Sequence, residues 1–330
     1  MVGRPAPSSI HRFLTNRFHW LCRITRFKPP RPMSLAQLYR FLETISWESL
    51  NQLIYEHFQF QLGGDQEWYA ADGKALRGSP GQQIISFRGH ESQLIQAQRR
   101  ISGPKSSEIT EVRALLTEYD LWNRKITLDA LHLNPLTTAG IHQKGGSYLI
   151  QVKENQPELR RIMGETALWG PACGRLESVD KGHGRLELRQ ATFFSLNHLS
   201  LDSRWENSGI QGLIVMERLT ENLKTGAITM ETSFYLTNRN VNSLEEQHAL
   251  FQAVRNHWGV ESDHWIRDVT FQEDRVRCSS SNRAQILGLL RTLALYLFRK
   301  IKVNNMRQTL ESFADLPEMF KKFLKQVNFL

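Results

Sequence analysis

The sequence predicts an α/β fold, with a mixed sheet, helices on both of its faces and a β-rich block inserted before the last acidic helix. Short β-branched and aromatic runs alternate with segments of helical spacing, in the order three strands, helix, strand, helix, strand, helix. After Leu168 strand-like runs follow one another with no convincing helix between them. Helical spacing then resumes in an acidic segment, and a strongly apolar helix is predicted after it.

The first part of the chain is expected to be irregular, then helical. Residues 1–30 are basic and lead into Pro29, Pro30 and Pro32, which break regular structure. Apolar residues recur every three or four positions over 35–60, which predicts a helix that ends at Gly63 and Gly64. No folded recognition module is expected before residue 35.

The central elements follow in order along the chain. Strands are predicted at 68–71, 83–88 and 94–99, the last two joined by a hairpin turn at 89–92. The further predicted elements are a helix at 106–119, strands at 125–130 and 147–152, a helix at 156–168, strands at 186–194, 213–219 and 227–236, and helices over 243–264 and 285–300.

Composition favours a polyanionic partner. The chain has 330 residues, is 40% hydrophobic and carries a net charge of +9. Residues 1–42 hold eight Lys or Arg and no acid, so the remaining 288 residues carry about +1. Phosphate contact by this segment and a merely solvated basic tail are both open interpretations. Cys22, Cys173 and Cys278 are too scattered for a disulfide framework, which favours the cytoplasm. The most apolar run, Ile286–Phe298, is too short to span a bilayer, so no membrane partner is expected.

Three acidic residues stand in unusual local contexts. Asp72 follows a predicted strand in AADGK, where Gly73 permits close approach of a ligand. Asp129 ends the predicted strand Ile126-Thr127-Leu128. A plain Asp-Gly turn and a helix cap are the alternative interpretations of these two residues.

Glu261 belongs to a helical stripe. His257, Glu261, His264 and Asp268 recur at spacings of 4, 3 and 4, which places them on one face. The neighbouring face is expected to pack on the core through Val254, Trp258, Trp265 and Val269. A stripe that faces solvent and a zinc site formed by the histidines with Glu261 are the alternatives.

Together the three acids indicate a metal-dependent enzyme. Carboxylate oxygens are the ligands that Mg²⁺ prefers, and Mn²⁺ tends to replace it. A pair of such ions stabilises both the attacking and the leaving oxygen in phosphoryl transfer. The sequence therefore predicts that Asp72, Asp129 and Glu261 hold Mg²⁺ in an enzyme that cuts and joins nucleic acid.

Basic residues near these acids are candidates for phosphate contact. Lys74 and Arg77 follow Asp72 directly, and Lys153 follows a predicted strand. His183 and Arg185 lie in the basic run Lys181–Arg185, which is predicted to be a flexible loop of the β-rich block. His257 completes the predicted set of DNA-binding residues.

Six motifs in order resemble one family. ADGKALRGS, KSSEITEVRALL, ITLDALH, KGGSYLIQVKENQPEL, HGRLELR and RNHWGVESDHWIRDVTFQED are similar to bacterial insertion-sequence transposases of the ISAs type, the H-repeat-associated proteins. The resemblance spans roughly residues 65–300. It implies an RNase H-like core with a DDE triad at Asp72, Asp129 and Glu261, and it places His257 where the wider group often has an arginine.

The resemblance also implies domains and partners. The expected division is a basic, partly helical and apparently truncated region at 1–64, the first part of the RNase H-like core at 65–168, a β-rich insertion at 169–242, and the catalytic-core helix with C-terminal helices at 243–330. DNA is the implied partner, through terminal inverted repeats and target DNA, with a homodimer in the DNA complex and association with the nucleoid when bound.

Two departures from the family pattern leave alternatives open. Residues 1–34 look shortened and scrambled, and the stretch between Glu261 and His264 is one residue shorter than usual. A structure-specific nuclease without strand transfer is one alternative to a transposase. A decayed or repurposed copy that binds DNA without cutting is the other.

Overall fold

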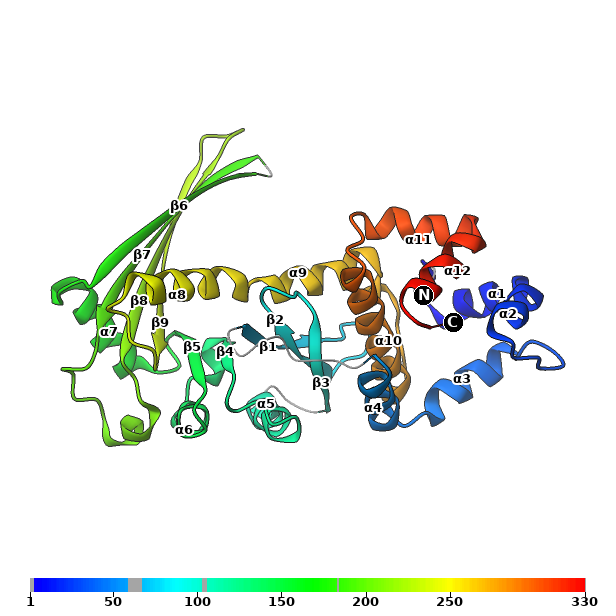
Figure 1. Cartoon of the computed structure of the whole chain (residues 1–330), viewed down its shortest axis with the longest axis horizontal. Helices are drawn as coiled ribbons and strands as arrows, with labels where there is room; N and C mark the ends of the chain where they lie inside the picture. The colour runs from blue at the N-terminus through cyan, green and yellow to red at the C-terminus, as the bar shows by residue number, and fades with distance from the viewer. Residues whose placement is uncertain (1–2, 59–66, 103–105, 183, 330) are drawn as a thin grey trace.

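One nine-stranded mixed sheet organises the molecule in the computed structural model, which describes residues 3–58, 67–102, 106–182 and 184–329 (Figure 1). The strands run across the sheet in the order β3-β2-β1-β4-β5-β9-β8-β7-β6. Their bounds are β1 Trp68–Ala75, β2 Gln82–Gly89, β3 Ile95–Ser102, β4 Lys125–Leu128, β5 Ser147–Val152, β6 Gly174–Gly182, β7 Arg185–Ser195, β8 Gly212–Asn222 and β9 Ile228–Thr237.

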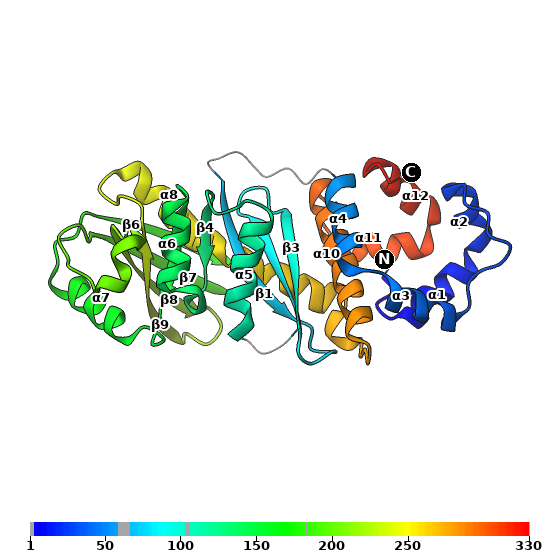
Figure 2. The ribbon, with the colours of Figure 1, turned by 90° about the horizontal axis from the view of Figure 1, so that it is seen from below.

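Helices cover both faces of the central strands, as the sequence predicts. α5 (Ser106–Glu118) and α6 (Pro135–Gln143) lie on one face, and α8 (Leu244–His257) and α9 (Gly259–Trp265) lie on the other (Figures 1 and 2). β1, β4 and β5 are parallel to one another, and the other pairs are antiparallel. All six residues of β5 are buried, because a strand covered on both faces needs apolar side chains on both.

The β-rich block continues the same sheet instead of forming a separate one. β9 pairs antiparallel with β5, and β6 to β9 extend outward from there. Their far ends project from the body as an arm, which we define as residues 176–182, 184–190 and 216–233 (Figure 1). The sequence does not predict β6, because this strand is largely exposed and has no continuous apolar run of the kind that marks a buried strand. α7 (Pro157–Trp169) precedes it.

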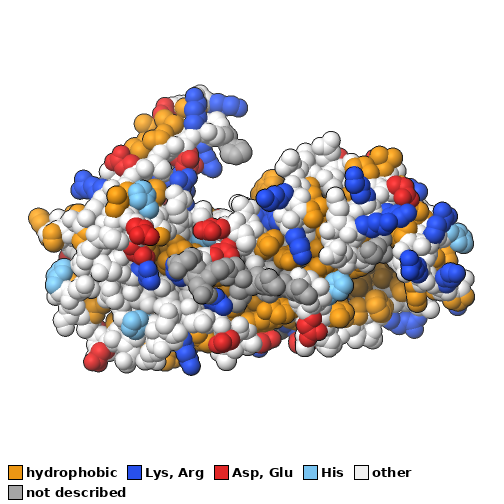
Figure 3. All heavy atoms as spheres, in the orientation of Figure 1, with side chains coloured by type: hydrophobic (Ala, Val, Ile, Leu, Met, Phe, Trp, Pro, Cys, Tyr) orange, Lys and Arg blue, Asp and Glu red, His pale blue; other side chains and the backbone are white. Residues whose placement is uncertain are grey.

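The prediction that residues 1–30 are irregular is wrong. They contain α1 (Pro7–Asn16) and α2 (Phe18–Thr25), and the three prolines follow these helices. Ile10 and Phe13 pack with the apolar residues of the C-terminal helices, so tertiary contact stabilises a segment whose basic residues point outward. Figure 3 shows Lys and Arg side chains gathered over this end of the molecule.

The remaining helices form a bundle beside the sheet. The predicted helix over 35–60 is two helices, because Ser46 caps a second one with its hydroxyl. The bundle consists of α3 (Leu35–Thr44), α4 (Trp47–His57), α10 (Ser281–Lys300), α11 (Met306–Asp315) and α12 (Pro317–Gln326). Gly63 and Gly64 lie outside the described residues. In the described part of the chain, no helix combines the length and apolarity that crossing a membrane requires.

Candidate active site

Asp72 lies inside β1 and not after it. The strand continues to Ala75, and Asp72 pairs in register with Ser86 of β2. The amide of Gly73 donates a hydrogen bond of 2.9 Å to the Asp72 carboxylate. The Asp-Gly turn is therefore excluded, because both residues are part of the antiparallel ladder.

Asp129 lies at the end of β4, as predicted, and also caps a short helix. Its carboxylate accepts a 2.6 Å hydrogen bond from the amide of Ala130, which begins the 3₁₀-helix Ala130–His132. The Lys153 ammonium lies 3.3 Å from the same oxygen. Burial alone would raise the pKa of Asp129, but these two donors outweigh burial and lower it. Asp129 is therefore a helix cap and can still be a metal ligand, so the two interpretations do not exclude each other.

Three of the four stripe residues face the sheet, so the solvent-facing alternative is wrong for them, whereas Glu261 is exposed. His257 Nδ1 lies 2.9 Å from Thr127 Oγ1 of β4, and His264 Nδ1 lies 3.8 Å from Asp72 Oδ2 of β1. Asp268 Oδ1 lies 2.7 Å from the ammonium of Lys74 in β1. The chain stays helical through Trp258, so Glu261 lies on the stripe between the two histidines. Three members of the stripe therefore contact β1 and β4, the strands that carry Asp72 and lead into Asp129.

Negative charge accumulates around Asp72. Burial, together with the charges of Glu108, Asp129 and Glu261, raises the pKa of this carboxyl to about 7. Asp129 and Glu261 thus both lie within electrostatic range of Asp72. No Lys or Arg in the described residues forms an ion pair with Asp72 or Glu261.

A divalent cation fits this donor set. Uncompensated carboxylates in a partly buried site are the chemistry that Mg²⁺ binding requires. In the part of the chain that the structure describes, no three His, Cys, Asp or Glu side chains already converge within metal-binding distances. Repulsion between like charges opposes such convergence when no cation is present.

Lys74 is buried in this structure, and the DNA-binding role predicted for it stays a prediction. Its ammonium lies in a buried ion cluster, 2.7 Å from Asp268 and 3.9 Å from both Glu273 and Asp274. Only 5% of the side chain is exposed. The Lys74 side chain ties β1 to the π-helical turn Ile266–Thr270 that follows α9.

Any DNA contact of His257 would come from a neutral ring, and that contact also stays a prediction. Burial, together with nearby His132 and Lys153, lowers its pKa to about 4 despite the opposing charge of Asp129. The ring is therefore neutral at pH 7, and its hydrogen bond to Thr127 gives it a positioning role.

The other predicted DNA-binding residues differ in placement. Lys153 is half-exposed beside Asp129. Arg77 is 79% exposed and lies 3.5 Å from Asp274. Arg185 pairs with Glu187 at 2.9 Å on the arm. His183 lies outside the described residues. Phosphate contact by Lys153, Arg77 and Arg185 remains a prediction.

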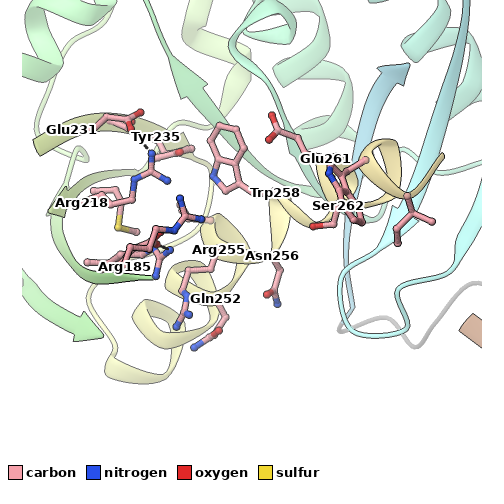
Figure 4. A pocket seen from close by; sticks show the side chains of 17 residues that line it. Arg185, Arg218, Glu231, Tyr235, Gln252, Arg255, Asn256, Trp258, Glu261 and Ser262 are labelled. Carbon is pink, nitrogen blue, oxygen red and sulfur yellow. Dashed lines mark hydrogen bonds and ion pairs between the residues drawn. The ribbon is translucent and has the colours of Figure 1, made fainter. Parts of the chain in front are cut away.

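A cleft opens beside Glu261, between the arm and the α8–α9 segment. It has a volume of about 820 Å³ and is lined by arginines of the arm and by two tryptophans next to Glu261 (Figure 4). Trp258 is 43% exposed and Trp265 is 60% exposed. The prediction that this face packs on the core is therefore wrong for Trp258, Trp265 and Val269, although Val254 is buried.

Sequence reasoning missed a buried clamp that holds the Glu261 helix. Asp263 is 2% exposed and receives a 2.9 Å hydrogen bond from Arg88 Nε of β2. Arg299 of α10 binds its other oxygen. Asp263 lies two positions from Glu261, so it is on a different face of the helix from the stripe. An acid on that second face is the one feature of the sequence that indicates a separate ion pair.

Comparisons with known proteins identify the family of the chain. A family model described as "Transposase DDE domain" matches residues 54–297. "Putative transposase YncI" of Escherichia coli O157:H7 is 27% identical over 92% of this chain and 80% of its own length. "H repeat-associated putative transposase YhhI" of Escherichia coli K12 is 28% identical over 72% of this chain and 66% of its own length. Because the family model covers well over half of the residues, the chain belongs to the transposase DDE domain family.

Proposed function

We propose that the chain is an insertion-sequence transposase that cuts DNA strands and joins the released ends to target DNA. The observation that carries this proposal is the electrostatic coupling of Asp72 with Asp129 and Glu261, which come from β1, from the end of β4 and from α9. Family membership indicates the class of reaction, which is transposition. The three carboxylates are the candidate metal ligands for that reaction.

The order of the central strands supports an RNase H-like core. β3, β2 and β1 form an antiparallel meander, and β4 and β5 add to it in parallel with a helix before each. We retain the proposed division at 65–168, 169–242 and 243–330 on this basis. The extension β6 to β9 then corresponds to the β-rich insertion, although it continues the same sheet.

Asp72, Asp129 and Glu261 would hold Mg²⁺, with Mn²⁺ as a substitute. Bound there, the ions would supply charge stabilisation to the attacking and leaving oxygens of the DNA phosphate. Lys153 would then be free to turn from Asp129 toward a phosphate oxygen, because cation binding neutralises the carboxylate that now holds it. His257 keeps Thr127 and the adjoining end of β4 in place beneath Asp129.

The cleft offers the DNA a surface next to Glu261. Arg185 and Arg218 project from the arm, and each is paired with a glutamate that phosphate oxygens can replace. The exposed rings of Trp258 and Trp265 present apolar faces on either side of Glu261. A homodimer that brings two DNA ends together is part of the proposal, as is recognition of terminal inverted repeats.

A cleavage and joining assay tests the function. Purified protein is incubated with labelled DNA that carries the flanking repeats of its own element, in Mg²⁺ or in EDTA, with a supercoiled target. We expect nicks at the repeat ends and joined products in Mg²⁺ alone. Cleavage without joined products would favour the nuclease alternative, and binding without cleavage would favour a repurposed DNA-binding copy.

The cleft arginines predict a change in salt dependence. The double variant Arg185→Ala with Arg218→Ala should bind DNA more weakly, because two phosphate contacts are lost, although Glu187 keeps its pair with Arg189. The slope of log affinity against log salt should become shallower by about 1.8, from roughly 0.9 for each contact.

The matched control removes two arginines of similar exposure outside the cleft. Arg161 and Arg204 are 55% and 52% exposed and pair with acids in their own segments. Fluorescence anisotropy across a salt series should show an unchanged slope for Arg161→Ala with Arg204→Ala. Equal effects of the two double variants would remove the cleft from the DNA path.

A further inference from the structure

A fourth carboxylate lies against the strand that carries Asp72. Glu108 is on α5 and is 7% exposed. A Cβ atom added at Gly73 would lie 2.9 Å from Oε1 and 3.0 Å from Cδ of Glu108. The Glu108 carboxylate therefore occupies the space that a side chain at position 73 would need, immediately beside Asp72.

The Glu108 carboxylate has little compensation. His132 Nε2 lies 3.6 Å from Oε1, beyond hydrogen-bonding distance, and the other ring nitrogen of this buried histidine has no partner. No Lys or Arg among the described residues pairs with Glu108, whereas Glu111 and Glu118 on the same helix both pair with Arg99. Of the three acids that act on Asp72, Glu108 raises its pKa the most.

A buried carboxylate beside a partly buried one is unfavourable without a cation. Removing an ionised carboxylate from water costs several kcal/mol unless hydrogen bonds or an opposite charge offset the loss. Here the described residues provide Glu108 with no hydrogen-bond donor. A bound divalent cation would supply the missing charge to both groups.

We propose that Glu108 is a fourth acidic ligand of the metal site, on the Asp72 side of the centre, with His132 behind it as a positioning residue. This inference rests on the proposed metal dependence of Asp72, Asp129 and Glu261. It explains why position 73 is glycine, since any larger residue would displace the Glu108 carboxylate from Asp72.

The test measures Mn²⁺ affinity and melting temperature in the full chain without DNA. Glu108→Gln keeps the side-chain volume but removes the charge. We expect Mn²⁺ binding, followed by calorimetry, to weaken by at least about tenfold. We also expect a higher melting temperature in EDTA, because the repulsion with Asp72 is gone. Gly73→Ala should weaken Mn²⁺ binding as well, although Glu108 is retained.

Glu111→Gln is the matched control, one turn farther along α5 and paired with Arg99 at 2.5 Å. It should leave the Mn²⁺ affinity unchanged. A Glu108→Gln protein that binds Mn²⁺ as tightly as the wild type would overturn the inference. If the wild-type chain itself binds no Mn²⁺, the proposed function fails first, so the two failures are distinguishable.

Discussion

Replacing Asp72 with asparagine should abolish Mg²⁺-dependent DNA cleavage while leaving DNA binding nearly intact. Asp72 is the acid whose charge is coupled to Asp129, Glu261 and Glu108, so its loss removes the shared member of the proposed metal site. We expect cleavage to fall by at least about a thousandfold, or about 4 kcal/mol of transition-state stabilisation. Asp129→Asn should have a comparable effect.

Cleavage and binding are measured separately, by gel analysis of nicked products and by mobility shift. Asp315→Asn is the control, because this exposed acid lies at the end of α11 in the helical bundle. It should cut as the wild type does. If the Asp72 and Asp129 variants retain normal cleavage, the reaction takes place elsewhere on the molecule.

The second large effect is expected on stability. Arg88→Leu should lower the free energy of unfolding by about 3–5 kcal/mol, because it leaves the buried Asp263 carboxylate with one of its two arginines. Burial raises the pKa of Asp263, which shows that its environment penalises the charge that the arginines compensate. Urea unfolding monitored by circular dichroism gives the difference directly.

A control on an exposed ion pair separates this effect from a general cost of losing arginine. Arg161→Leu removes two surface pairs on α7 and should cost about 1 kcal/mol or less. The further variant Asp263→Leu in the Arg88→Leu background should regain part of the lost stability, because no uncompensated carboxylate remains. Equal destabilisation by Arg88→Leu and Arg161→Leu would contradict the proposed clamp.

The elements that could be predicted from sequence are those in which local pattern and tertiary packing agree. β5 and α10 are strongly apolar, and both lie where their patterns place them. The spacing of His257, Glu261, His264 and Asp268 predicts a shared face, and contacts with β1 and β4 confirm it for all of them except Glu261. The position of Asp129 at the end of β4 is predicted by the β-branched run before it, which is a short-range pattern.

The errors arise where residues distant in sequence decide the outcome. Nothing near Lys74 indicates that Asp268 and Glu273, about 200 positions away, bury its ammonium. Trp258 and Trp265 have the periodicity of a core face, but the two rings line the cleft beside the arm and are not covered by another element. α1 contacts the C-terminal bundle through Ile10 and Phe13, and α2 does so through Trp20, which donates a hydrogen bond to Glu318. Their local pattern is interrupted, so the sequence alone does not predict these helices.

Anomalous diffraction from crystals grown with Mn²⁺ is the most direct test of the central claim, that Asp72, Asp129 and Glu261 form one metal site. We predict anomalous density bounded by these three carboxylates, with Asp72 in contact with the ion. Data collected at the zinc edge should show no ion held by His257 and His264. Density at the two histidines, or Mn²⁺ bound away from Asp72 and Asp129, would contradict the account.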